Sequence, residues 1–121
     1  MSDTWDGSTR VLDERLRLGA GFGAADRRHV LELLSSLTRH LARWKPEKVD
    51  LEISVKDRSG PEQKVMLEAL LPGLGVVVAT AASRELDHAV IEARKELIRQ
   101  IDDEKDKRSD HKGQTQRHGP A

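Results

Sequence analysis

The chain has 121 residues, which is enough for one domain of ordinary size and too few for two. Its 21 basic and 21 acidic side chains give a formal net charge of zero, which excludes a general attraction to nucleic acid, so phosphate binding would require local sorting of charge. The absence of cysteine excludes disulfides, thiolate metal sites and cysteine nucleophiles.

The first third of the chain changes from an alternating pattern to a helical one. Residues 1–9 are small and polar and predict a flexible N-terminal tail. In segment 10–18, apolar and charged side chains alternate, which predicts a half-buried strand. Glycines interrupt this pattern in segment 19–23. The apolar residues of segment 25–44 then recur at helical spacing, and Pro46 ends the predicted helix.

Three more strands and a second helix follow. Segment 49–56 alternates most clearly, and two further strands are predicted over residues 63–71 and 76–81, with Gly- and Pro-containing turns between them. Ser83 is the predicted N-cap of a long helix, because its hydroxyl can accept a hydrogen bond from a first-turn amide. Apolar residues line one face of that helix as far as Ile101.

The order of these elements is β-α-β-β-β-α. A β-α-β unit is a right-handed crossover between parallel strands, and the strands after it should form antiparallel hairpins. Each helix has a single apolar stripe, and the strands need only one covered face. We therefore predict an α+β fold, a two-layer sandwich of a four-stranded mixed sheet with both helices on one face. The predicted domain spans residues 10–108, and residues 109–121 are expected to be a disordered C-terminal tail.

Sequence motifs for catalysis are missing. The chain has no nucleophile elbow and no P-loop motif, and its five histidines lack the spacing of a helical zinc site. We expect no enzyme activity, no metal, no cofactor and no small-molecule substrate. The glycines of segment 19–23 lie between a strand and a helix, where their amides could bind a phosphate. The alternative is a flexible turn, which the hairpins further along the chain favour.

Basic side chains lie on the predicted outer sides of both helices. The first helix presents Arg28, Arg39 and Arg43, and the second presents Lys95 and Arg99. Such side chains could contact RNA phosphates. Acidic residues share both surfaces, however, and from charge alone an ordinary exterior with ion pairs one helical turn apart is favoured.

The stretch from Val76 to Ile101 resembles the end of the hibernation-promoting factor and ribosome-associated inhibitor family. It has an apolar strand that ends in small residues and a long helix with the segment Leu97-Ile-Arg-Gln-Ile. The alternating segment 49–55 after an aromatic-ended helix is also similar, as is the order of elements. The resemblance covers about residues 16–107 and is to the short form, which lacks the C-terminal dimerisation domain.

This resemblance implies a translation inhibitor or hibernation factor of the stress response. Such a protein binds small-subunit ribosomal RNA near the decoding region and blocks the transfer RNA and messenger sites. The resemblance implies basic contacts at Arg27, Arg99, Lys105 and Lys107. With the helix charges, the expected RNA-binding residues are Arg27, Arg28, Arg39, Arg43, Lys95, Arg99, Lys105 and Lys107. The expected partners are the small ribosomal subunit and its RNA.

Membrane partners are not expected. No apolar run approaches the roughly 20 residues that cross a bilayer, and the polar, acidic start of the chain is not typical of a signal peptide. We therefore expect a cytoplasmic protein.

Four residues depart from the family pattern. Leu33, Ser36, Glu96 and Asp103 stand where similar proteins often carry lysine. Each lost phosphate contact lowers the salt-dependent part of the affinity. The alternative function is therefore a protein-interaction module on the same fold, with weakened or lost RNA binding.

Overall fold

The computed structural model describes the backbone of residues 11–118 and the side chains of residues 11–104. Its four strands form one sheet in the order β1 (Leu16–Leu18), β2 (Asp50–Lys56), β3 (Gln63–Leu71) and β4 (Gly75–Ser83). The β1 strand is parallel to β2, and the β2–β3 and β3–β4 pairs are antiparallel. This confirms the predicted mixed sheet.

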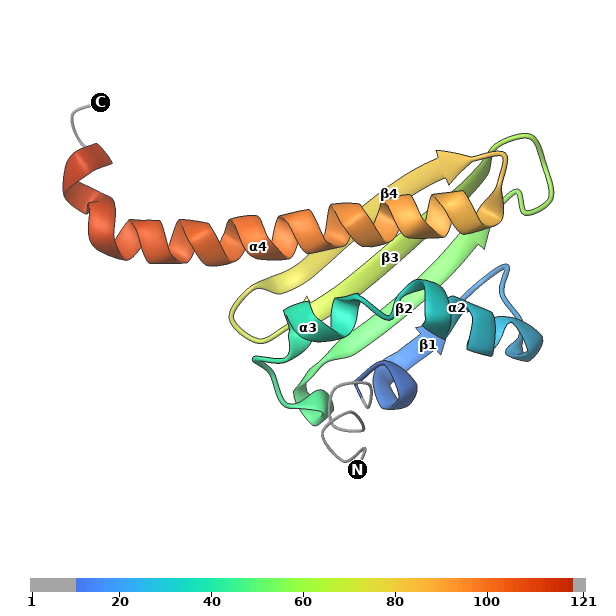
Figure 1. Ribbon diagram of the computed structural model, residues 1–121, viewed down its shortest axis with the longest axis horizontal. Coiled ribbons are helices and arrows are strands. Elements are labelled where there is room, and N and C mark those ends of the chain that lie inside the picture. Colours follow the sequence, from blue (N-terminus) through green and yellow to red (C-terminus); the bar gives the residue numbers. More distant parts are fainter. Residues whose placement is uncertain (1–10, 119–121) are drawn as a thin grey trace.

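The helices cover one face of this sheet (Figure 1). They are α2 (Arg27–Leu33), α3 (Leu37–Leu41) and α4 (Leu86–His118), and the short 3-10 turns η1 (Ala24–Asp26) and η2 (Pro46–Lys48) flank the first two. Alternate strand residues point into the core, and these meet the apolar stripes of the helices. The largest fully buried side chains are Leu34, Leu37, Leu41, Leu51, Ile53, Leu67, Leu71, Leu97 and Ile101. The predicted two-layer α+β sandwich is confirmed.

The segment before β1 differs from its prediction. We predicted a strand from residue 10, but residues 11–15 are helical and β1 is only three residues long. Val11 and Leu12 are neighbours in sequence and both are buried, which an alternating strand on a one-sided sheet does not allow. The Arg15 guanidinium fixes the helical turn, because its Nε donates to the Val49 carbonyl at 2.8 Å.

The first predicted helix is interrupted. Instead of one helix over residues 25–44, α2 and α3 are separated by a turn at residues 34–36. The Thr38 hydroxyl donates to the Ser35 carbonyl at 2.9 Å, and hydroxyl residues of this kind compete with helical hydrogen bonds. The Arg94 guanidinium of α4 donates to the Leu33 carbonyl at 2.8 Å, so the end of α2 is satisfied from outside.

The second helix starts later and extends further than predicted. Ser83 is the last residue of β4, and its hydroxyl accepts the Glu85 amide at 3.1 Å, so the helix begins at Leu86 and not directly after Ser83. The backbone of α4 stays helical to His118 and continues past the sheet (Figure 1). The division into a domain over residues 10–108 and two tails stays a prediction. Residues 1–10 and 119–121 and the side chains from residue 105 lie outside the described part. None of the described helices is long and apolar enough to cross a membrane.

Candidate RNA-binding surface

Charge is sorted between the two halves of the helix layer. Residues 24–48, which hold α2 and α3, carry six basic and three acidic side chains. Residues 84–104, which hold the part of α4 that covers the sheet, carry four basic and seven acidic side chains. The positive surface of the described layer therefore lies on α2 and α3. A neutral net charge conceals this local excess, and local excess is what binding to phosphates requires.

Three arginines form an exposed positive group on α2, on α3 and in the turn after α3. Arg28, Arg39 and Arg43 are exposed, and none has an ion pair with another side chain of residues 11–104. The guanidinium carbon of Arg43 lies 5.0 Å from the centre of the Trp44 ring, which orients it by a cation–π contact. Trp44 is itself fixed, because its indole N–H donates to the Pro72 carbonyl at 3.0 Å. We call Arg28, Arg39 and Arg43 the arginine group.

Arg27 has a different environment from its neighbour Arg28. Its guanidinium donates to the Leu16 carbonyl at 2.9 Å and to the Asp13 carbonyl at 2.7 Å. These bonds tie the start of α2 to the segment that leads into β1. The side chain is half-buried, so the donors of Arg27 primarily hold the fold together.

The two predicted cations of α4 are paired with carboxylates. Lys95 Nζ lies 3.4 Å from a Glu92 carboxylate oxygen. Arg99 makes two hydrogen bonds to Glu96, at 2.6 and 3.2 Å, and a third to Asp103 at 3.0 Å. The hydrogen bond with Arg99 lowers the pKa of Glu96, and the same bond raises the pKa of Arg99. The positive charge of Arg99 is therefore shared with two carboxylates.

Lys105 and Lys107 have side chains outside the described residues. By sequence, residues 105–118 carry five basic and two acidic side chains. The helical backbone of this segment extends beyond the sheet (Figure 1). Its charge has the same sign as that of the arginine group.

Histidine–aspartate pairs join the two halves of the layer. His29 Nε2 on α2 lies 2.8 Å from Asp87 Oδ2 on α4, and His40 Nδ1 on α3 lies 3.3 Å from Asp102 Oδ1. The hydrogen bond to Asp87 raises the pKa of His29 above its ordinary value. These two histidines thus connect α2 and α3 to α4. Among the described residues, no three His, Asp or Glu side chains are grouped so that they could hold a metal ion.

The glycine turn before α2 is already occupied by the chain's own carboxylate. The Gly23 amide donates to Asp26 at 2.8 Å, and the Arg58 guanidinium donates to both Asp26 oxygens at 2.8 and 3.0 Å. The hydrogen bond from Arg58 holds the pKa of Asp26 far below its usual range. A phosphate at this position would meet that carboxylate, so the phosphate-binding interpretation is wrong. These hydrogen bonds anchor the turn to Asp26 and Arg58.

Gly21 explains why this turn is rich in glycine. Its φ of +87° lies in the left-handed region, and a Cβ there would collide with the Val55 carbonyl oxygen. The turn runs directly against β2, with the Val55 amide donating to the Ala20 carbonyl at 2.9 Å. The glycine spacing therefore serves chain packing.

The fold has a counterpart among solved structures. It is similar to that of a ribosomal subunit interface protein from Coxiella burnetii. The two chains align with a TM-score of 0.53 and 18% sequence identity, over 75% of this chain and 97% of the other. No protein-family model and no curated protein sequence matches this chain. At this identity the similarity establishes a shared fold, and the residues above must carry any argument about function.

Proposed function

We propose that this protein is a non-enzymatic, ribosome-associated translation inhibitor or hibernation factor of the cytoplasm. It binds small-subunit ribosomal RNA near the decoding region and so blocks the transfer RNA and messenger sites. The observation that carries the proposal is the arginine group, three exposed guanidinium groups on one half of the helix layer that have no ion pair with any side chain of residues 11–104. The similarity in fold to a ribosomal subunit interface protein supports the choice of the ribosome as partner.

Within this proposal the eight predicted residues have unequal roles. Arg28, Arg39 and Arg43 make the main phosphate contacts. Lys105 and Lys107 extend the contact along α4. Arg27, Lys95 and Arg99 contribute less, because their donors are already engaged within the chain. A contact made chiefly through phosphates needs no base readout and weakens as salt rises.

The experiment is co-sedimentation of the purified protein with isolated small and large ribosomal subunits at low salt. We expect the protein to pellet with the small subunit. Chemical footprinting of the complex should protect nucleotides of the decoding region. Failure to pellet with small subunits would contradict ribosome binding, and protection elsewhere would contradict only the proposed site.

The protein-interaction module is the second candidate function. It is favoured by the acidic α4 surface, where seven carboxylates accompany four basic groups. In that case a partner recovered from extract would remain bound after nuclease treatment. Loss of all recovered material on nuclease treatment would favour RNA as the partner.

A further inference from the structure

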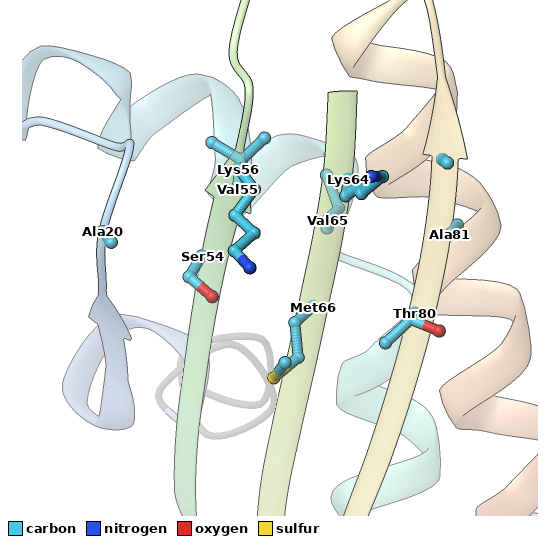
Figure 2. A pocket seen from close by; sticks show the side chains of 10 residues that line it. Ala20, Ser54, Val55, Lys56, Lys64, Val65, Met66, Thr80 and Ala81 are labelled. Atoms are coloured by element: carbon cyan, nitrogen blue, oxygen red, sulfur yellow. The ribbon is translucent and has the colours of Figure 1, made fainter. Parts of the chain in front are cut away.

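The sheet face opposite the helices carries an ordered pattern of side chains, which Figure 2 shows in part. Even-numbered residues of β2, β3 and β4 point to this face, and the strand register places them in rows across the sheet. One row holds Ser54, Met66 and Thr80. The rows on either side of it contain charged residues. We call the whole sheet face opposite the helices the open face.

The charged rows place like charges opposite each other. Lys56 pairs with Lys64 across β2 and β3, and four residues away along β2 Glu52 pairs with Glu68. Like charges directly opposite on neighbouring strands are destabilising. Arg17 Nη2 lies 3.7 Å from Glu52 Oε1, and Lys64 Nζ lies 3.9 Å from Asp57 Oδ2. The charge repulsion within each row is therefore partly compensated.

Each charged row contains one residue without an ion-pair partner among residues 11–104. Among residues 11–104, Lys56 and Glu68 have no ion-pair partner. In Figure 2 the Lys56 ammonium group points over the open face. The open face thus has a basic end and an acidic end, with an uncharged row between them.

Apolar side chains fill the rest of the open face. Met66 is 43% exposed, Leu70 46%, Val76 58% and Val78 39%. A hollow of about 520 Å³ lies beside Met66 and is floored by small side chains, including those of Thr80 and Ala82. Exposed apolar groups gathered on one face of a small protein are typical of an interaction surface.

We propose that a second copy of this chain packs on the open face. The two copies are related by a two-fold axis that lies in the interface and crosses the strands at the row of Met66. This rotation reverses the strand direction, so the basic end of each copy faces the acidic end of the other. Lys56 then lies against Glu52 of the second copy, and Lys64 lies against its Glu68. The same contact repeats on the other side of the axis, because a two-fold interface is self-complementary.

The same rotation matches shape as well as charge. The row of Lys64 contains Ala82, and the row of Glu68 contains Val78. The large Val78 side chain of one copy is therefore opposite the small Ala82 of the other, and it enters the hollow. Sheets that pack face to face interdigitate side chains in this way, at a separation of about 10 Å.

The size of the open face sets the strength of the dimer. The rotation brings three strands about 4.8 Å apart and three rows about 6.7 Å apart face to face, which is a smaller area than the roughly 800 Å² per partner of a stable interface. The row of Leu70 and Val76 lies outside this contact. We expect a weak dimer whose formation depends on protein concentration. It dissociates as salt rises, because its charge pairs lie at the exposed rim.

Sedimentation velocity of the whole chain tests the proposal, over about 1 µM to 1 mM protein and about 50 to 500 mM salt. The wild-type chain should shift from monomer to dimer with concentration, at low salt. One variant carries Lys56→Glu and Lys64→Glu, and the other carries Glu52→Lys and Glu68→Lys. Each should dimerise at least about tenfold more weakly than the wild type, because its face then repels itself. An equimolar mixture of the two variants should recover a dimer.

The mixture also controls for folding, because misfolded variants could not restore each other. A matched control with Arg28→Glu and Arg43→Glu changes the charge by the same amount on the helix layer and should dimerise like the wild type. A wild-type chain that is monomeric throughout the range would overturn the proposal. So would a dimer that both variants retain, or a mixture that stays monomeric. Ribosome binding through the helix layer is independent of this result.

Discussion

His29 and Asp87 connect two helices that are 58 residues apart in the chain, with 2.8 Å between Nε2 and Oδ2. The pair ties α2, which carries part of the arginine group, to the first turn of α4. His40 and Asp102 make the corresponding link from α3 at 3.3 Å. The position of the arginine group relative to α4 is therefore set in part by these two histidine–aspartate contacts.

The first prediction concerns pH. The pKa of His29 is raised in the folded chain, mainly by its hydrogen bond to Asp87 and further by nearby Glu32. A raised pKa stabilises the fold below the ordinary value of about 6.5, and this stabilisation is lost as pH rises through the folded value. Asp87→Asn should therefore lower the thermal unfolding midpoint at about pH 6 and have a smaller effect at about pH 8.5. Thermal unfolding of both proteins across this range is the measurement, and an effect of equal size at both ends would refute the linkage.

The second prediction concerns the core under α4. Leu97 is fully buried between the helix and the sheet. Leu97→Ala should lower the free energy of unfolding by about 2–5 kcal/mol, because it removes buried methyl groups and leaves a cavity. The exposed neighbour Lys95 provides the control, since Lys95→Ala should change the free energy of unfolding by less than about 0.5 kcal/mol. Urea denaturation of both variants measures the difference. Similar losses of stability in the two variants would mean that Leu97 does not pack in the core under α4.

The third prediction concerns the glycine turn. Gly21→Ala should destabilise the fold by about 1–3 kcal/mol, because the residue has a positive φ and its Cβ would meet the Val55 carbonyl. Gly23→Ala is the matched change in the same turn. It should cost far less, since Gly23 has a φ of −120° and its nearest neighbour is 4.0 Å from the added Cβ. Equal stability of the two variants would show that the turn is not held against β2.

The fourth prediction concerns Arg99. Replacing its partners by Glu96→Gln and Asp103→Asn removes both compensating charges and should strengthen binding to small ribosomal subunits. The slope of log affinity against log salt should steepen by roughly one for each added phosphate contact. Adding Arg99→Gln to this double variant should cancel part of the increase in affinity. If the full increase persists, it comes from removing acidic charge in general and not from Arg99.

Much of the sheet could be predicted because its signals are local. The β3 strand has the predicted bounds, since buried residues alternate with exposed or half-buried ones from Gln63 to Leu71. The sequence does not reveal the break between α2 and α3, because the apolar spacing continues through Leu34 in the turn and Leu37 at the start of α3, and both are buried. Only the Ser35-Ser36 pair indicated a weak point in that helix.

The contacts of the candidate site also include some that the sequence predicts and some that it does not. The pairing of Arg99 could have been found from sequence, because Glu96 and Asp103 stand three and four residues from it. The bonds of Arg27 to the chain before β1 could not, since they depend on how α2 lies against that segment. The His29–Asp87 contact likewise joins positions that no periodicity relates.

The most direct test of ribosome binding is the salt dependence of affinity for isolated small subunits. The variant carries Arg28→Gln, Arg39→Gln and Arg43→Gln. The control carries Arg17→Gln, Lys56→Gln and Lys64→Gln, which remove the same charge away from the helix layer. We expect the arginine variant to bind more weakly than wild type, with a salt slope reduced by roughly three, and the control to bind like wild type. Equal affinity and slope for the arginine variant and the wild type would contradict the assignment of the arginine group as the RNA-binding surface.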